Sequence, residues 1–125
     1  MRKAIWILLL AGVNSSATAA WVKVGQDENV TTYVDPATIR KTDNMVKMLA
    51  LFNYTSKRFY ASMKVQTEHN CKKYESRGLS LSYYSEKMGE GQMVNNESTH
   101  LEWAPVSPGS VDEALWEIAC KKNKN

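Results

Sequence analysis

Alternation of apolar and polar positions with a period of two dominates the chain and is typical of strands with one covered face. Between Ala61 and Cys71, one set of alternate positions is mainly apolar and the other is polar, which predicts a strand with Cys71 on its covered face. Residues 78–84 alternate in the same way. The run Met45–Tyr54 is apolar on both faces apart from Lys47, and this pattern predicts a central strand.

Shorter β-rich runs flank this central part of the chain. Residues 21–25 and 30–34 are separated by a turn-prone segment and predict an opening hairpin. Asp35-Pro36 then interrupts the pattern, and residues 37–40 predict a single helical turn. A last short strand is expected over residues 92–94. These runs predict an antiparallel sheet of about six strands, with one packed face and one face exposed to solvent.

The last apolar segment has helical rather than strand spacing. After a polar connecting loop over residues 95–109, Ser110 and Glu113 form a capping box that opens a helix ending near Cys120. The apolar stripe of this helix consists of Val111, Ala114, Leu115 and Ile118. The stripe needs a partner, and the covered face of the sheet supplies one. The predicted fold class is therefore α+β, with the C-terminal helix packed on one face of the sheet.

The N-terminus has the layout of a secretory signal peptide. Basic residues precede an apolar run from Ala4 to about Val13, which is about half of the ~20 residues needed to span a bilayer. Small residues at positions 17 and 19 fit a signal peptidase, so we expect cleavage after Ala19, with Ala20 as the alternative. A buried amphipathic helix is the alternative interpretation of this segment.

Removal of residues 1–19 leaves a single domain over residues 20–125, and we expect it to be exported. A lipoprotein would carry a cysteine where Val13 stands, so the mature chain is expected without a lipid anchor. The periplasm is the expected compartment, with the cell surface or the medium as alternatives.

Composition narrows the classes of partner and predicts a cross-link. Without Arg2 and Lys3, 14 basic and 13 acidic residues remain, a balance that gives no indication of a nucleic-acid partner. Cys71 and Cys120 are the two cysteines of the chain, and an oxidising compartment favours one disulfide between them. Their wide spacing favours a structural cross-link over a redox or metal site.

Catalytic or cofactor-binding chemistry has little support in the sequence. No phosphate-binding, dinucleotide-binding or zinc-protease motif is present, and we expect no cofactor and no catalysis. His69 falls on the packed face and is predicted to be a hydrogen-bonded core histidine. The alternative is a functional site at His100, with Glu97 and Glu102 nearby: a weak zinc or copper site, or a small hydrolytic centre. Otherwise these three residues belong to ordinary surface.

A protein-binding surface is the more specific hypothesis. Tyr60, Lys64, Arg77 and Tyr84 are candidates for the solvent-exposed face of the sheet. Tyrosine and arginine are enriched where proteins recognise each other, so these residues form the candidate binding surface. A merely solvated sheet face is the alternative.

Several segments together resemble a known family, the surface-adhesin protein E domain of Gram-negative bacteria. They are YVDPATIRK, SMKVQTEHNCKKYESRG, LSYYSEKMGEGQMV, Trp103, the Pro108-Gly109-Ser110 turn and VDEALWEIAC. The resemblance covers essentially the whole mature chain. It implies a sheet of about six strands whose terminal helix is tied to it by the cysteine pair.

The resemblance also implies a non-enzymatic protein that binds host extracellular-matrix or plasma proteins. The adhesin type is displayed on the outer membrane through an N-terminal lipid, and Val13 departs from that pattern. An envelope protein is therefore a second expected partner, and an inhibitor of a periplasmic enzyme is an alternative function. The resemblance transfers no binding residue to this chain, because no ligand motif matches position by position.

Overall fold

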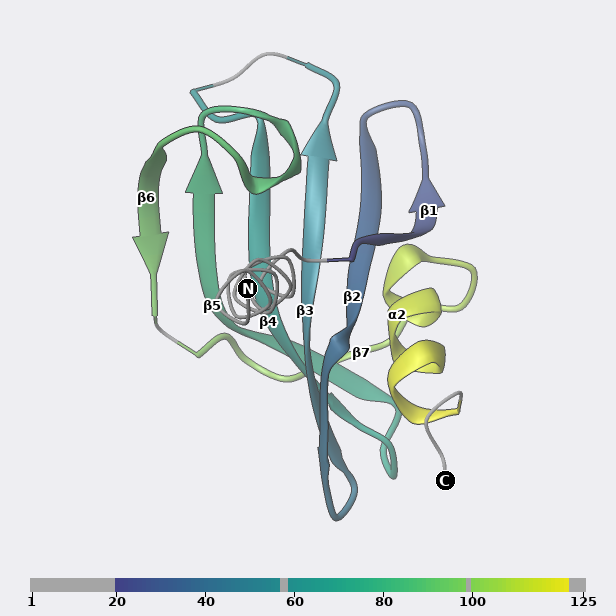
Figure 1. Cartoon of the computed structure of the whole chain (residues 1–125). Coiled ribbons are helices and arrows are strands. Elements are labelled where there is room, and N and C mark those ends of the chain that lie inside the picture. Colours follow the sequence, from purple (N-terminus) through teal and green to yellow (C-terminus); the bar gives the residue numbers. More distant parts are fainter. Residues whose placement is uncertain (1–19, 57–58, 99, 122–125) are drawn as a thin grey trace, which may run out of the picture.

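The structure is a computed structural model that describes residues 20–56, 59–98 and 100–121 (Figure 1). The predicted signal peptide, residues 1–19, lies outside the described residues. Within them the chain forms β1 (Val22–Gln26), β2 (Val30–Thr42), β3 (Met45–Tyr54), β4 (Ser62–Asn70), β5 (Glu75–Tyr84), η1 (Lys87–Gly89), β6 (Met93–Glu97), β7 (Ala104–Pro105) and α2 (Val111–Cys120). None of the helices in these ranges is long and apolar enough to cross a membrane.

The sheet follows the order of the chain. Its strands run β1-β2-β3-β4-β5-β6, and each strand pairs antiparallel with the next. The expected sheet of about six strands with one terminal helix is confirmed. The segment expected to be a plain loop adds a seventh strand, because β7 pairs with the start of β5 at Glu75 and Ser76.

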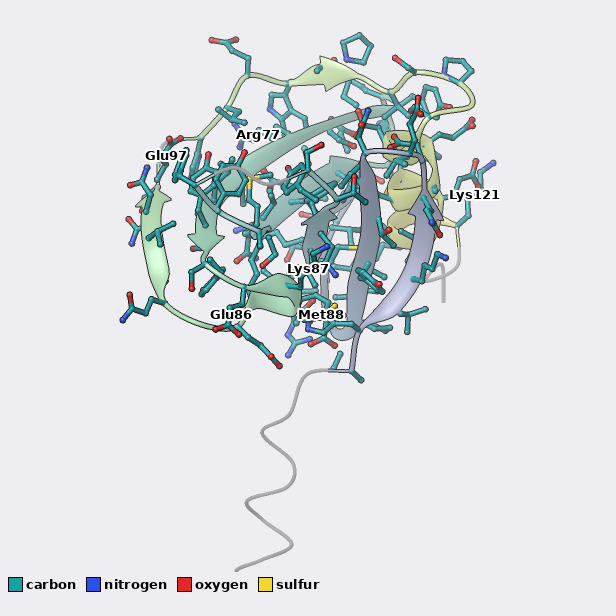
Figure 2. All side chains as sticks on the ribbon, turned by 90° about the horizontal axis from the view of Figure 1, so that it is seen from above. Arg77, Glu86, Lys87, Met88, Glu97 and Lys121 are labelled. Carbon is teal, nitrogen blue, oxygen red and sulfur yellow. A yellow bond between two sulfur atoms is a disulfide. The ribbon has the colours of Figure 1, made fainter. Side chains whose placement is uncertain are left out.

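The central strand has the bounds that its apolar run predicted. β3 spans Met45–Tyr54 and lies between β2 and β4. Val46, Met48 and Ala50, on one face of β3, are fully buried beneath α2. We call this side of the sheet the α2 side and the opposite side the η1 side; Figure 2 shows η1 and α2 on opposite sides.

The helical turn expected over residues 37–40 is wrong, because β2 continues through this segment to Thr42. Four residues of β2 lie opposite one residue of β3 here, so the strand contains a wide bulge. The Thr38 hydroxyl stabilises the bulge: it donates to the Asp35 carbonyl at 2.7 Å and accepts from the Leu49 amide at 2.9 Å. Side-chain hydrogen bonds thus replace the missing rungs of the ladder.

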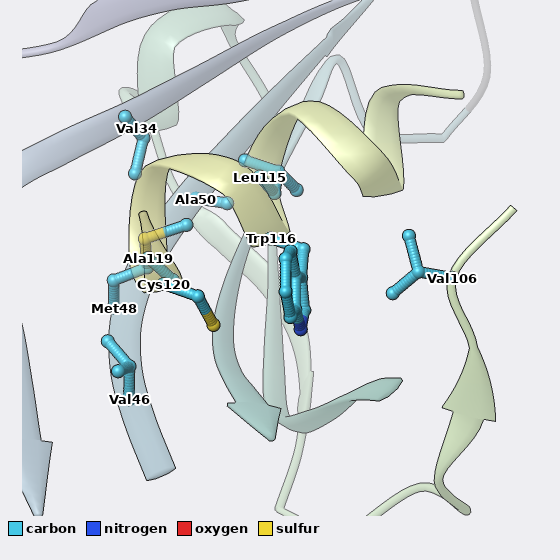
Figure 3. Close-up of a cluster of buried hydrophobic side chains, with 9 residues drawn as sticks. All are labelled: Val34, Val46, Met48, Ala50, Val106, Leu115, Trp116, Ala119 and Cys120. Atoms are coloured by element: carbon cyan, nitrogen blue, oxygen red, sulfur yellow. The ribbon is translucent and has the colours of Figure 1, made fainter. Parts of the chain in front are cut away.

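The helix α2 begins and ends where its spacing predicted and closes the main core (Figure 3). The Ser110 hydroxyl accepts a hydrogen bond from the Glu113 amide at 3.2 Å, as expected for one half of a capping box. The other half differs, because the Glu113 carboxylate accepts from the Gly109 amide while the Ser110 amide donates to Ser107. The buried core comprises Val34, Val46, Met48, Ala50, Val106, Leu115, Trp116, Ala119 and Cys120.

The η1 side is not uniformly exposed, which corrects the expectation of one solvent-exposed face. Ser62 was expected on that face, yet it is 0% exposed. Its hydroxyl donates to the Glu86 carbonyl at 2.6 Å and accepts from the Gly89 amide at 2.9 Å, so η1 folds down over it. Gly89 has φ +69°, and a Cβ there would lie 2.4 Å from the Lys64 side chain. The absence of a side chain at Gly89 lets η1 approach the sheet this closely.

Candidate functional site

The α2 side of the sheet is closed at one end by a covalent bond. Cys71 and Cys120 form the predicted disulfide, with their Cα atoms 5.3 Å apart. It joins the turn after β4 to the last residue of α2. Beside it, the Trp116 indole N–H donates to the carbonyl of Asn70 at 3.1 Å. Two different bonds therefore attach the helix to the same turn.

A second pair of contacts fixes the first turn of the helix to the start of β5. The Tyr74 hydroxyl donates to a carboxylate oxygen of Glu113 at 2.6 Å, and its ring meets Trp116 edge to face at 4.8 Å. The hydrogen bond to Glu113 is the main cause that raises the pKa of Tyr74 to about 12. The same hydrogen bond, followed by that from the Gly109 amide, lowers the pKa of Glu113. These contacts hold the helix against the start of β5.

His69 is the core histidine that the alternation predicted. It is 1% exposed, and its Nδ1 and Nε2 lie 2.7 Å from the Ser76 hydroxyl and 2.9 Å from the Thr67 hydroxyl. Burial lowers the pKa of His69 to about 4, because the imidazolium would lose its hydration there. The ring is therefore neutral at physiological pH, and both nitrogens are engaged in hydrogen bonds.

An apolar groove of about 310 Å³ runs along the α2 side of the sheet, from His69 and Leu115 beside the helix to Met63 at the opposite, open end. This volume lies at the small end of the range for ligand pockets, enough for an apolar side chain or a small apolar group. His69, Thr67 and Ser76 supply polar groups to the lining. Three charged residues, Arg77, Glu102 and Asp112, also line the groove. Its apolar lining consists of Phe52, Met63, Val65, Leu81, Leu101, Ala104, Pro105, Val106 and Leu115.

Four aromatic rings form a cluster above this groove, which we call the aromatic cluster: Tyr54, Phe59, Tyr60 and Tyr83. Tyr60 lies at its centre, with ring centroids 4.7 Å from Phe59, 4.8 Å from Tyr83 and 5.4 Å from Tyr54. Phe59 is 69% exposed. Burial is the main cause that raises the pKa of Tyr83, with smaller contributions from Glu97 and Tyr60. Tyr83 pairs across the sheet with Met63, so the cluster continues into the groove.

The structure divides the four residues proposed from the sequence between the two sides of the sheet. Lys64 and Tyr84 lie together on the η1 side, with the ammonium 5.0 Å from the ring centroid. Arg77 forms an ion pair with Glu68 at 2.9 Å and stacks over the ring of Trp103 at 4.5 Å, so its guanidinium is already engaged. Tyr60 instead belongs to the aromatic cluster on the α2 side.

Sequence reasoning missed the aromatic cluster because it depends on a loop. Alternation placed Tyr83 on the packed face, and Phe59 lies outside any strand. The available signal was local: Tyr54, Phe59 and Tyr60 bracket one short connection between two strands. Rings at both ends of such a connection meet when the strands pair.

The alternative metal site has no geometric support among the residues that the structure describes. His100, Glu97 and Glu102 are all exposed. In residues 20–56, 59–98 and 100–121, no three His, Cys, Asp or Glu side chains lie together in a way that could hold a metal ion.

Comparison with known proteins agrees with the fold just described. The family model for surface-adhesin protein E matches residues 21–121. Two solved structures of Haemophilus influenzae protein E are similar to this chain. The first, crystal form II, has a TM-score of 0.68 at 16% identity and covers 86% of this chain and 92% of its own. The second has a TM-score of 0.65 at 17% identity and covers 84% of this chain and 86% of its own. No curated protein matches by sequence.

Proposed function

We propose, because this chain belongs to the surface-adhesin protein E family, that it is an exported, non-enzymatic protein that binds a protein partner. The partner is a host matrix protein or a protein of the bacterial envelope. The periplasm is the proposed compartment for the mature chain, with the cell surface as the alternative.

One observation carries the proposal: the open end of the α2 side presents an exposed aromatic ring beside an apolar groove. Aromatic side chains dominate the energetics of protein interfaces, and hot spots sit in apolar pockets that exclude water. Phe59 contacts Tyr60 and Tyr83. Tyr83 pairs across the sheet with Met63, which lines the groove. We therefore assign the groove to an apolar side chain of the partner, with the aromatic cluster packing around it.

Binding of the purified mature chain to immobilised extracellular-matrix and plasma proteins tests the proposal. Biolayer interferometry measures the affinity for each. We expect at least one micromolar or tighter interaction, weakened about tenfold or more by Phe59→Ala with Tyr60→Ala, because a hot-spot residue contributes ~2 kcal/mol or more. If no matrix, plasma or purified envelope protein binds, the proposed function is wrong.

A matched pair on the opposite side of the sheet serves as the control. Lys64→Ala with Tyr84→Ala removes an amine and a ring from the η1 side, where the sequence placed the binding surface. We expect this variant to bind as well as wild type. Loss of binding in it alone would move the interface to the η1 side and overturn the assignment of the groove.

A further inference from the structure

Three segments far apart in the sequence meet at one end of the molecule and bring basic side chains together. They are the β2–β3 turn, the β4–β5 turn and the C-terminal end of α2, which lie at the lower end of Figure 1. The Cys71 amide donates to the carbonyl of Asn44 at 2.8 Å, which joins the two turns, and the disulfide adds the end of the helix. We call this end the basic pole; its cations are Arg40, Lys41, Lys47, Lys72, Lys73 and Lys121.

The basic pole has few carboxylates to neutralise it. Every one of its six cations is exposed, and the neighbouring acids are Asp43, Glu68, Glu75 and Glu117. Glu117 pairs with Lys121 at 3.4 Å. Within the described ranges, the five other cations of the pole have no carboxylate oxygen within 4.0 Å. This excess contrasts with the nearly neutral mature chain.

Two of these cations face each other in an unfavourable arrangement. Arg40 on β2 lies directly opposite Lys47 on β3, and like charges in that position destabilise a sheet. The Arg40 guanidinium donates to the carbonyls of Ala37 and Ile39 at 2.9 and 2.8 Å, which orients it without neutralising it. On its other side Lys47 lies opposite Glu68, which is engaged by Arg77, so Arg40 and Lys47 remain available to an anionic ligand.

Arg40 and Lys47 also line an open groove of about 590 Å³. Its other lining residues are Thr42, Asp43, Asn44, Met45 and Glu68. The Glu68 carboxylate is occupied by Arg77 on its far side, which leaves Asp43 as the acid that offsets the two cations. Guanidinium, ammonium, hydroxyl and amide groups together are donors suited to sulfate or phosphate oxygens.

We propose that the basic pole binds a linear sulfated polysaccharide, with one sulfate group between Arg40 and Lys47 and its neighbours along the chain near Lys72 and Lys73. A thin polyanion matches an open groove that is lined by two cations and has Lys72 and Lys73 in the neighbouring β4–β5 turn. A lipid surface is disfavoured, because the large exposed hydrophobic residues, Val22, Phe59, Met93, Val94 and Leu101, all lie outside the pole. This surface is separate from the aromatic cluster, so the inference does not depend on the proposed protein partner.

A heparin-derived octasaccharide is the probe, and its affinity is measured by isothermal titration calorimetry at two salt concentrations. We expect binding to wild type that weakens as salt rises, because exposed charges are screened. Arg40→Ser with Lys47→Ser should weaken binding about tenfold or more, since two charge-assisted contacts are lost. The melting temperature of this variant should stay close to that of wild type, because removal of the repulsive pair offsets the loss of the Arg40 hydrogen bonds. That second result shows that the variant is folded.

Lys23→Ser with Lys87→Ser is the matched control, because it removes the same charge from exposed positions outside the pole. We expect it to bind within about twofold of wild type, as does Phe59→Ala with Tyr60→Ala. Equal losses in the control and the pole variant would overturn the site. Binding to vesicles of phosphatidylglycerol and phosphatidylcholine without binding to the octasaccharide, or equal binding to its desulfated form, would overturn the sulfated ligand.

Discussion

The two ends of the α2 side are made from the same strands, yet they are closed in opposite ways. At one end a disulfide, an indole hydrogen bond and the Tyr74–Glu113 bond hold α2 against the sheet. At the other end lies the aromatic cluster with its exposed ring Phe59, and an apolar groove runs from there along the sheet to Leu115 of α2. We call these the locked end and the open end. The first end stabilises the fold, and the second is the end at which we propose recognition of a partner.

This division suits a small domain, whose total stability is limited. A chain of this size buries about two-thirds of its unfolded surface and has limited stability to spare. Apolar surface left uncovered for a partner contributes nothing to folding, so the covered remainder has to be held firmly. The disulfide and the helix contacts are concentrated where the sheet is covered, as that requirement predicts.

Removal of the disulfide at the locked end should have the largest effect on the free energy of unfolding. Cys71→Ser with Cys120→Ser should lower the free energy of unfolding by about 4 kcal/mol, because the cross-link closes a loop of 49 positions. Urea denaturation followed by circular dichroism measures the change. A reductant should destabilise wild type by a similar amount and leave the double variant unaffected. A decrease in the free energy of unfolding of less than about 1 kcal/mol would contradict the conclusion that the disulfide stabilises the locked end.

Protonation of His69 should give the next largest effect. The pKa of His69 is about 4 in the folded chain and 6.5 in the unfolded chain, so the unfolded state binds the proton more tightly. The stabilisation is fully present above pH 6.5 and is lost as pH falls toward 4. The difference in stability across this window should reach about 3 kcal/mol.

Urea denaturation between pH 4 and pH 7 measures this dependence in wild type and in His69→Gln. The difference between the two curves isolates His69 from carboxylates that titrate in the same range. His100→Asn is the matched control, because that side chain is exposed. An identical pH slope in wild type and His69→Gln would show that His69 is not the group responsible.

Loss of the helix cap should have a smaller effect at the locked end. Ser110→Ala removes the hydroxyl that accepts from the Glu113 amide and should cost about 1 kcal/mol of unfolding free energy. Ser110→Asp keeps an acceptor at the same position and should stay within about 0.5 kcal/mol of wild type. Thermal or urea denaturation distinguishes the two. Equal losses in both variants would assign the effect to the Ser110–Ser107 contact instead.

A substitution at the open end should have the smallest effect on the free energy of unfolding. Phe59→Ala should change the free energy of unfolding by less than about 0.5 kcal/mol, because the ring is 69% exposed. A loss of 2 kcal/mol or more would mean that the aromatic cluster is part of the core. In that case the comparison between the two ends would fail.

Regular patterns let the sequence predict the elements that dominate the fold. The apolar run of β3, the capped helix and the cysteine pairing all appear in the structure as expected. In each of these cases the controlling signal is local: a periodicity, a cap or a count of two cysteines. The long-range disulfide could be predicted because the alternation along β4 indicated the side of the sheet on which Cys71, the next residue, lies.

Two features could not be predicted from the sequence patterns, because side chains outside each pattern determine them. Asp35-Pro36 is typical of a strand end, but the Thr38 hydroxyl supplies the missing hydrogen bonds and β2 continues. Ser62 alternates as an exposed residue, but η1 returns from more than twenty positions later to cover it. The four residues of the candidate binding surface do not lie together for a similar reason, since Tyr60 is placed by its loop and not by a strand.

The order of the strands has a consequence for how the chain is made. Each strand from β2 to β6 pairs with the one before it, so this part of the sheet can assemble in the order in which it is synthesised. The residues that cover Val46, Met48 and Ala50 belong to α2, which is synthesised last. A product truncated before Val111 therefore has a nearly complete sheet with a bare apolar side, an aggregation-prone species that quality-control proteases would have to remove.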